Sequence, residues 1–181
     1  MSTVLISGAS GYLALHIVSQ LLKNGYTVIG TVKSSAKATI LTGLFSEPRL
    51  SFEIVPDVGT PGAFDEVFQN HPDIEFVIHA AAVLPSGIDK DDYYHAFFET
   101  SVKSTTNIPE SIRDFAPNVK HVVHTSSNAA LQNFKYPSDP SAVVSEETWN
   151  ETSWEDVKDF EPMAYSYSKA EAERSARSFV K

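Results

Sequence analysis

The stretch Thr3–Asn24, which reads TVLISGASGYLALHIVSQLLKN, decides the fold expected for this chain. Its apolar, partly β-branched beginning, Thr3–Ser7, predicts a buried strand. The glycine turn Gly8–Ala14 follows, and it leads into a predicted helix. Apolar residues recur along that helix at Leu13, Ile17, Val18, Leu21 and Leu22. A strand that feeds a glycine turn and then a helix brings free N–H groups and the positive end of a helix dipole to one place. Such a place binds phosphate.

The spacing of the turn is G-x-x-G-x-x-A, which differs from the three-glycine dinucleotide fingerprint. Two glycines three residues apart also occur in simple tight turns, and this alternative stays open. The strand before the turn and the helix after it are the context that dinucleotide binding requires, so the stretch favours a dinucleotide site. The residues expected to contact the cofactor here are Gly8, Ser10, Gly11, Tyr12 and Leu13.

Composition restricts the class of protein. The chain has 181 residues, of which 42% are hydrophobic and 20% charged, as expected for one globular α/β domain over residues 1–181. A net charge of −9 argues against nucleic acid or an anionic membrane as a partner. The absence of cysteine excludes disulfides, zinc–thiolate sites and cysteine nucleophiles. No apolar run approaches the roughly 20 residues of a membrane span and no secretory signal is predicted, so a cytoplasmic protein is expected.

Strand and helix patterns alternate along the rest of the chain. Further strands are expected at Tyr26–Val32, Ser51–Val55, Glu75–Ala80 and Val119–Thr125. Further helices are expected at Ser34–Phe45, Pro61–Asn70, Asp91–Ala116 with an interruption at Pro109, and about Met163–Val180, the last preceded by a loop with Pro137 and Pro140. This alternation predicts right-handed βαβ crossovers and a Rossmann-type, doubly wound parallel sheet of strand order 3-2-1-4-5.

The end of the second expected strand bears on which dinucleotide binds. An acidic residue there hydrogen-bonds the ribose of NAD, whereas a basic group accommodates the 2′-phosphate of NADP. This chain has no acid at that place but carries Lys33 and Lys37, which favours NADP(H). The alternative is that both lysines are solvated residues at a helix start. Asp57, after the third strand, is expected to accept from the adenine amino group with Val58 beside it. The alternative for Asp57 is a turn residue.

A second informative stretch is Tyr165–Lys169, which reads YSYSK. A tyrosine and a lysine four residues apart lie on one face of a helix. A lysine ammonium beside a phenol stabilises the phenolate, so the phenol can exchange a proton with a carbonyl or an alcohol. The Y-x-x-x-K pattern is common by chance. Here, however, it follows a strand that ends in Thr125-Ser126-Ser127, whose hydroxyls can orient a substrate oxygen.

This three-part arrangement resembles the extended branch of the short-chain dehydrogenase/reductase superfamily. Within it, the chain is most similar to the fungal NADPH-dependent methylglyoxal and aldehyde/ketone reductases, which are relatives of the plant dihydroflavonol reductases. The resemblance covers nearly the whole chain. Its segments are Val4–Ala14, Tyr26–Gly30, Glu53–Asp57, Ala63–Asp65, Val122–Ser127, Glu146–Asn150 and Tyr165–Lys169.

The resemblance implies roles for individual residues. Ser127 orients the carbonyl oxygen, Tyr165 is the general acid, and Lys169 holds both the tyrosine and the nicotinamide ribose. Of the two adjacent serines, Ser126 is the less suited to the first role. The implied reaction is the NADPH-dependent reduction of an aldehyde or ketone, with a small carbonyl compound as substrate.

The resemblance also extends to the cofactor contacts, which are expected to include Tyr165 and Lys169 of the YSYSK stretch. Lys33 and Lys37 match the basic pair of the family at the 2′-phosphate. The segment at the end of the fourth expected strand departs from the family pattern, but its small residues Ala80 and Ala81 still suit a backbone that passes close to the cofactor. No metal is expected, because His79, His121 and His124 lie on or beside strands and are better explained as packed strand residues than as metal ligands.

Length separates this sequence from the family it resembles. Family members continue well beyond the Tyr/Lys helix, and this chain ends at Lys181, twelve residues after Lys169. A truncated Rossmann domain without the C-terminal substrate region is therefore expected, and the surface thereby exposed favours self-association. Two alternatives to the reductase stay open. One is an NADP(H)-binding module with little or no turnover, and the other is a sugar-nucleotide epimerase or dehydratase.

Overall fold

The computed structural model describes residues 2–131 and 143–179. The chain divides into two compact units, one formed by residues 1–82 with 106–125 and the other by residues 83–105 with 126–181. The expectation of a single domain therefore stays a prediction. Pro137, Pro140 and the expected helix end at Val180 lie outside the described residues.

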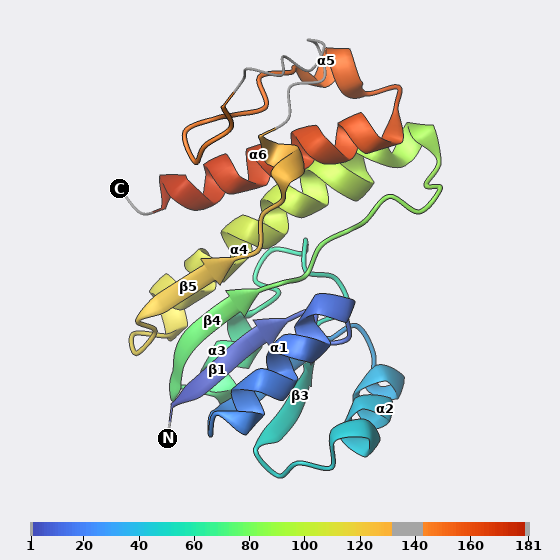
Figure 1. Cartoon of the computed structure of the whole chain (residues 1–181). Helices are drawn as coiled ribbons and strands as arrows, with labels where there is room; N and C mark the ends of the chain where they lie inside the picture. Colours follow the sequence, from blue (N-terminus) through green and yellow to red (C-terminus); the bar gives the residue numbers. More distant parts are fainter. Residues whose placement is uncertain (1, 132–142, 180–181) are drawn as a thin grey trace. The chain divides into compact units, whose positions relative to one another are not determined.

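The first unit contains a five-stranded parallel sheet (Figure 1). Its strands are β1 (Thr3–Ser7), β2 (Thr27–Val32), β3 (Leu50–Ile54), β4 (Ile74–His79) and β5 (His121–His124). Their order is β3-β2-β1-β4-β5, which confirms the predicted Rossmann-type topology. Every residue of the central strand β1 is buried. The first βα unit of the sequence therefore forms the middle of the sheet.

Two separate cores lie against the two faces of this sheet. Neighbouring residues of a strand point to opposite faces. Ile6 accordingly packs in the core that includes α1 (Tyr12–Lys23) and α2 (Ser35–Phe45). Leu5 packs in the other core, to which α3 (Asp65–Asn70) and α4 (Thr100–Phe115) contribute. Figure 1 shows α1 and α3 on opposite sides of the sheet. This is the doubly wound arrangement that the alternation of elements predicts.

Two predicted helix boundaries are wrong. The helix expected from Pro61 begins at Asp65, because Gly62 has a φ of 72°, which a right-handed helix does not accommodate. The expected interruption at Pro109 does not occur, and α4 runs through it. The irregular part lies upstream, in a 3₁₀ turn, η1 (Lys90–Asp92), and a π-helical segment, η2 (Tyr94–Glu99).

Tertiary contacts explain why α4 tolerates its proline. A proline removes one backbone donor from the helix, and the neighbouring residues hold the helix in place. Asn107 donates to the carbonyl oxygens of Val58 and Thr60 at 2.9 and 2.8 Å, and Ser111 donates to Asp65 at 2.6 Å. These bonds tie α4 to the loop after β3 and to α3 on both sides of the proline.

The second unit is built on the long helix α6 (Glu161–Ser178), with the short helix α5 (Trp154–Val157) and the 3₁₀ turn η3 (Asn128–Ala130). The π-helical η2 and η3 both pack against α6. Its core centres on Tyr93, Phe97 and Ala164. At the start of α6, the carboxylate of Glu161 accepts backbone N–H bonds from residues 86–88, which joins the first segment of this unit to the helix.

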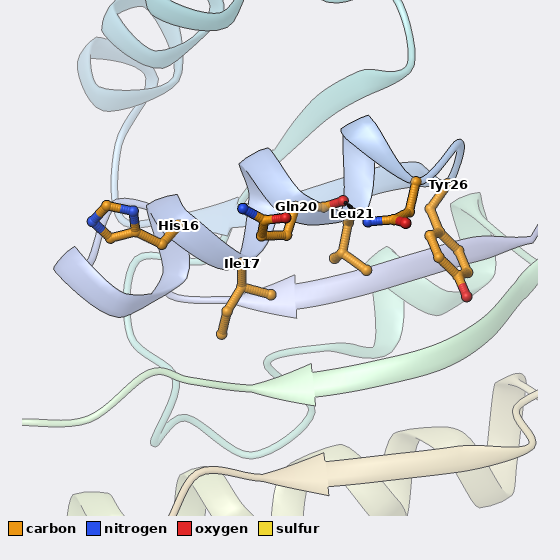
Figure 2. A pocket seen from close by; sticks show the side chains of 6 residues that line it. His16, Ile17, Gln20, Leu21 and Tyr26 are labelled. Carbon is orange, nitrogen blue, oxygen red and sulfur yellow. Dashed lines mark hydrogen bonds between the residues drawn. The ribbon is translucent and has the colours of Figure 1, made fainter.

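Part of the sheet beside α1 is not covered. Val123 of β5 is 56% exposed, although parallel sheets are usually covered on both faces. A hollow of about 190 Å³ lies over β4 and β5, and a neighbouring hollow of about 440 Å³ lies along α1. Leu21 and Tyr26 line both hollows, and Figure 2 shows these two side chains among those that line the larger one. No predicted site residue lines either hollow. The expectation that an exposed face supports self-association stays a prediction.

Within residues 2–131 and 143–179, none of the helices combines the length and the apolar character that crossing a membrane requires.

Candidate functional site

The glycine turn after β1 needs glycine for steric reasons. Gly8 has a φ of 67°, and a Cβ on it would lie 2.8 Å from the Cα of Ala81. A second close approach lies under the turn, where a Cβ on Gly30 would meet the Cβ of Ala9 at 2.7 Å. The structure therefore brings Gly8 and Ala81, both predicted cofactor residues, to one place at the carboxyl end of the sheet. Backbone approaches closely there, as a dinucleotide site requires.

The first turn of α1 presents free backbone donors. Gly11 is the N-cap, no side chain of the described residues caps it, and the turn contains no acidic residue. The first N–H groups of a helix have no acceptor within the helix, so this end suits an anion. Tyr12 is 84% exposed and Leu13 is 52% exposed. The prediction that Leu13 belongs to the apolar stripe is wrong, because the core that packs on α1 does not include it. Ser10 is half-buried within the turn.

A buried serine fixes the segment after β4. The Oγ of Ser7 accepts the N–H groups of Ala80 and Ala81, each at 3.1 Å. Both its lone pairs are then used, so its O–H donates to the Nδ1 of His79 at 2.7 Å. His79 is buried, as expected for a packed histidine. Ser7 and His79 therefore hold Ala80 and Ala81 against the glycine turn. Neither was predicted as part of the site.

The two predicted phosphate-binding lysines lie around the start of α2. Lys33 directly follows β2, and Lys37 is in the first turn of α2, where its N–H donates to the N-cap Ser34 at 3.4 Å. Both side chains are exposed. Thr31, which precedes them in β2, is uncharged. Its hydroxyl accepts a hydrogen bond from the N–H of Gly8 at 3.3 Å. The observed N-cap agrees with the predicted start of this helix.

Asp57 has the turn role that was the alternative to adenine binding. Its carboxylate accepts from the N–H of Gly59 at 2.9 Å and from the hydroxyl of Thr60 at 3.2 Å. A contact with adenine stays a prediction, because a carboxylate has further lone pairs. The loop is also held by Asn107, which bonds to the carbonyl oxygen of Val58. No local sequence pattern around Asn107 predicted this contact, which spans 49 positions.

The three predicted catalytic residues all belong to the second unit. Tyr165 and Lys169 lie four residues apart in α6, and Lys169 is only 4% exposed. Ser127 is the N-cap of η3 and accepts the N–H of Ala129 at 3.2 Å, which leaves its O–H proton for another acceptor. Because η3 packs against α6, Ser127 lies in the segment next to the helix that carries the tyrosine and the lysine.

The structure distinguishes the two tyrosines of the YSYSK stretch. Tyr165 places its ring edge-on to Phe97, with centroids 6.2 Å apart. Tyr167 instead packs between Phe98 and Trp154, and burial, followed by the nearby Glu171, raises the pKa of its phenol. A raised pKa opposes proton exchange near neutral pH. Tyr167 is therefore a packing residue. The intervening serines are also structural, since both donate to the carbonyl four residues earlier, as Ser166 does to Pro162 at 2.8 Å.

Burial changes the acid–base chemistry of Lys169. Desolvation lowers the pKa of its ammonium, and the negative charge of Glu173 opposes that change. Buried polar and charged groups with shifted pKa values are typical of functional sites. Elsewhere in the described ranges, no group of three or more histidine, aspartate or glutamate side chains is placed to hold a metal ion.

Comparison with known proteins gives a consistent result. The family described as "NAD dependent epimerase/dehydratase family" matches residues 4–181. An oxidoreductase of Saccharomyces cerevisiae, named as uncharacterised, is 44% identical over 99% of this chain and 53% of its own length. The NADPH-dependent methylglyoxal reductase of the same yeast is 40% identical over 98% of this chain and 52% of its own length.

A solved structure extends this similarity to the fold. The crystal structure of the yeast methylglyoxal/isovaleraldehyde reductase, complexed with NADPH, superposes with a TM-score of 0.93 at 39% identity. The match covers 98% of this chain and 52% of that one. The chain thus spans about half the length of the curated relatives that it matches.

Proposed function

This chain belongs to the NAD-dependent epimerase/dehydratase family, and from its site we propose that it is an NADPH-dependent reductase of small aldehydes or ketones. The observation that carries the proposal is the catalytic helix. Tyr165 and the buried Lys169 share one face of α6, with Ser127 in the segment packed against it. The similarity to the yeast methylglyoxal reductase supports the same reaction.

The turn after β1 supports NADP(H) as the cofactor. The glycine backbone and the free donors of α1 suit the pyrophosphate, while Lys33 and Lys37 would hold the 2′-phosphate. Ala80 and Ala81 would line the cofactor, since Ser7 fixes them beside Gly8. The relative solved with NADPH supports the same assignment. When bound, NADPH would supply the hydride that reduces the carbonyl carbon.

The residues of the second unit would handle the oxygen of the substrate. Ser127 would donate its O–H to the carbonyl oxygen and orient it. Tyr165 would give its phenolic proton to that oxygen as negative charge develops on it. Lys169 would stabilise the resulting phenolate with its ammonium and donate to the nicotinamide ribose. The product is an alcohol, and the phenol regains its proton from solvent.

The relatives support a proposal for the substrate class. The yeast relative is named for methylglyoxal and isovaleraldehyde, both small carbonyl compounds, and we infer that this chain takes substrates of this class. The expected place of action, the cytoplasm, is part of this proposal. Because the chain spans about half the length of these relatives, a module that binds NADP(H) without turnover is the second candidate.

The testing experiment is a fluorescence titration of the purified chain with NADPH and then NADH, followed by turnover with methylglyoxal. Saturable binding that prefers NADPH, together with NADPH consumption, supports the reductase. Binding without consumption supports the module. Binding of a UDP- or GDP-sugar, without aldehyde reduction, supports the sugar-nucleotide alternative. Failure to bind either nicotinamide cofactor contradicts both NADP(H) proposals.

A further inference from the structure

The carboxylate of Glu173 has a partner on each of its two oxygens. The hydroxyl of Ser126 donates to Oε2 at 2.5 Å, and the guanidinium of Arg177 donates to Oε1 at 2.8 Å from Nη2 and 3.1 Å from Nε. The side chain of Glu173 is only 16% exposed. A carboxylate held in this way has a fixed position, because charge-assisted hydrogen bonds to both of its oxygens restrict its rotation. All of these residues belong to the second unit.

The bond from Ser126 acts on the residue beside it. Ser126 is joined directly to Ser127, whose side chain is needed for the proposed orientation of the carbonyl. Because Ser126 donates to α6 while Ser127 caps η3, the two serines anchor this short segment at two points. The distance between the Ser127 hydroxyl and the catalytic face of α6 therefore depends on Glu173. The geometry of a catalytic site has to hold within about half an ångström.

Glu173 also lies one helical turn after Lys169. Residues four apart in a helix are neighbours on one face, so the carboxylate and the ammonium are close in α6. Lys169 is buried, and burial by itself disfavours the charged ammonium. Glu173 is the charged group that counteracts this effect by raising the pKa of Lys169. Arg177, further along the same helix, faces Glu173 and pairs with it.

We propose that Glu173 is a positioning residue of the reductase site, which anchors Ser127 through Ser126 and provides the negative charge opposite Lys169. This inference rests on the proposed function. It assigns a role to Ser126 as well. Ser126 is not the serine that meets the substrate but the one through which the catalytic segment is attached to the catalytic helix.

The test uses Glu173→Gln, which keeps the shape and removes the charge, with Glu171→Gln as the matched control. Glu171 lies on the same helix and pairs with Arg174, so its loss removes an ion pair of the same kind outside the site. The first readout is the titration of the Lys169 side chain by NMR with ¹³C-labelled lysine, assigned with Lys169→Arg. This readout needs neither cofactor nor turnover.

The expected result is that Glu173→Gln lowers the pKa of Lys169 by about one unit, as loss of a neighbouring charge does at intermediate dielectric constant. Glu171→Gln leaves that pKa unchanged. In turnover, the alkaline limb of kcat for carbonyl reduction moves to lower pH by a similar amount in Glu173→Gln only. Ser126→Ala lowers kcat about tenfold at constant KM for NADPH, and Ser126→Thr, which keeps the hydroxyl, restores it.

Two results would overturn the inference. One is that the pKa of Lys169, measured by NMR, is the same in Glu173→Gln, in Glu171→Gln and in the unchanged chain. The other is an active Ser126→Ala with unaltered kcat. Failure of the proposed function looks different, since the unchanged chain would then lack turnover while the NMR titration still reports whether Glu173 acts on Lys169.

Discussion

The glycine turn after β1 and the catalytic turn of α6 are built by opposite means. The glycine turn depends on the lack of side chains. A Cβ on Gly8 would collide with Ala81, and Gly11 has no side chain that could cap the N–H groups of α1. At the catalytic turn of α6, side chains carry the site. Lys169 is a buried cation, and Glu173 is a nearly buried anion with a partner on each oxygen.

This difference determines how each region responds to change. A backbone site depends on conformation and close approach, so added atoms damage it. A side-chain site depends on charge and hydrogen bonds, so removed atoms damage it. The catalytic turn of α6 also lowers the stability of the fold, because burial disfavours the charged form of Lys169. The following substitutions separate the two regions, beginning with the largest expected effect.

Replacing Tyr165 by phenylalanine should separate chemistry from binding. We expect kcat to fall by roughly 10²- to 10⁴-fold, because the general acid is lost. The Kd for NADPH should stay within about twofold, since the glycine turn is untouched. Tyr167→Phe is the control, because its ring belongs to the aromatic packing. Steady-state kinetics and fluorescence titration measure both quantities. An equal loss of kcat in the two variants would contradict the assignment of Tyr165.

Replacing Gly8 by alanine should damage the other region. The methyl group would collide with Ala81, so we expect a loss of about 2–4 kcal/mol of unfolding free energy and at least a tenfold weaker NADPH affinity. Gly25→Ala is the matched control, since Gly25 also has a positive φ of 85° but no atom within 4 Å of its Cβ position. We expect it to cost only about 1 kcal/mol and to keep binding. Urea unfolding and fluorescence titration with NADPH measure both variants. They show whether the contact with Ala81, rather than the positive φ, causes the loss of stability and affinity.

Replacing Lys33 and Lys37 together by alanine tests cofactor preference. We expect NADPH affinity to fall about tenfold or more while NADH affinity is unchanged, because only NADPH carries the 2′-phosphate. Lys23→Ala, in the last turn of α1, changes charge away from this place and serves as the control. Parallel titrations with the two cofactors give the result. A matching loss for NADH would show that the lysines act by general electrostatics or through the fold.

Replacing Lys169 by methionine should stabilise the chain while it abolishes turnover. Burial lowers the pKa of this lysine in the folded state, so between the folded and unfolded pKa values the unfolded state binds more protons. The contribution of Lys169 therefore makes stability rise with pH across that window, towards the unfolded pKa of about 10.4. We expect Lys169→Met to gain about 1 kcal/mol at neutral pH and to lose that part of the pH dependence. Urea unfolding at several pH values measures the free energy of unfolding and its pH dependence. A Lys169→Met variant that is less stable than the unchanged chain at neutral pH would contradict this expectation.

Local patterns predicted the framework well. The TVLIS strand, the glycine turn and the strand order follow from apolar periodicity and from the chirality of βαβ crossovers, which act over short stretches. The two wrong helix boundaries have local and tertiary causes. Gly62 adopts a left-handed conformation that delays α3, whereas the contacts of Asn107 and Ser111 carry α4 through Pro109. The YSYSK spacing placed Tyr165 and Lys169 on one helix face, but it did not predict the aromatic packing of Tyr167 against Phe98 and Trp154.

What the sequence by itself determined is the set of positions whose chemistry depends on near neighbours: the glycine turn, the missing acid after β2 and the Tyr/Lys pair. Only the tertiary structure decided the partners of Ser7, Asn107, Ser126 and Glu173. All four side chains bond to residues more than 45 positions away, with Ser126 and Glu173 bonded to each other across 47 positions, and no periodicity of one or two turns encodes such a contact. Burial likewise arises from packing, and it is burial that gives Lys169 its altered acid–base behaviour.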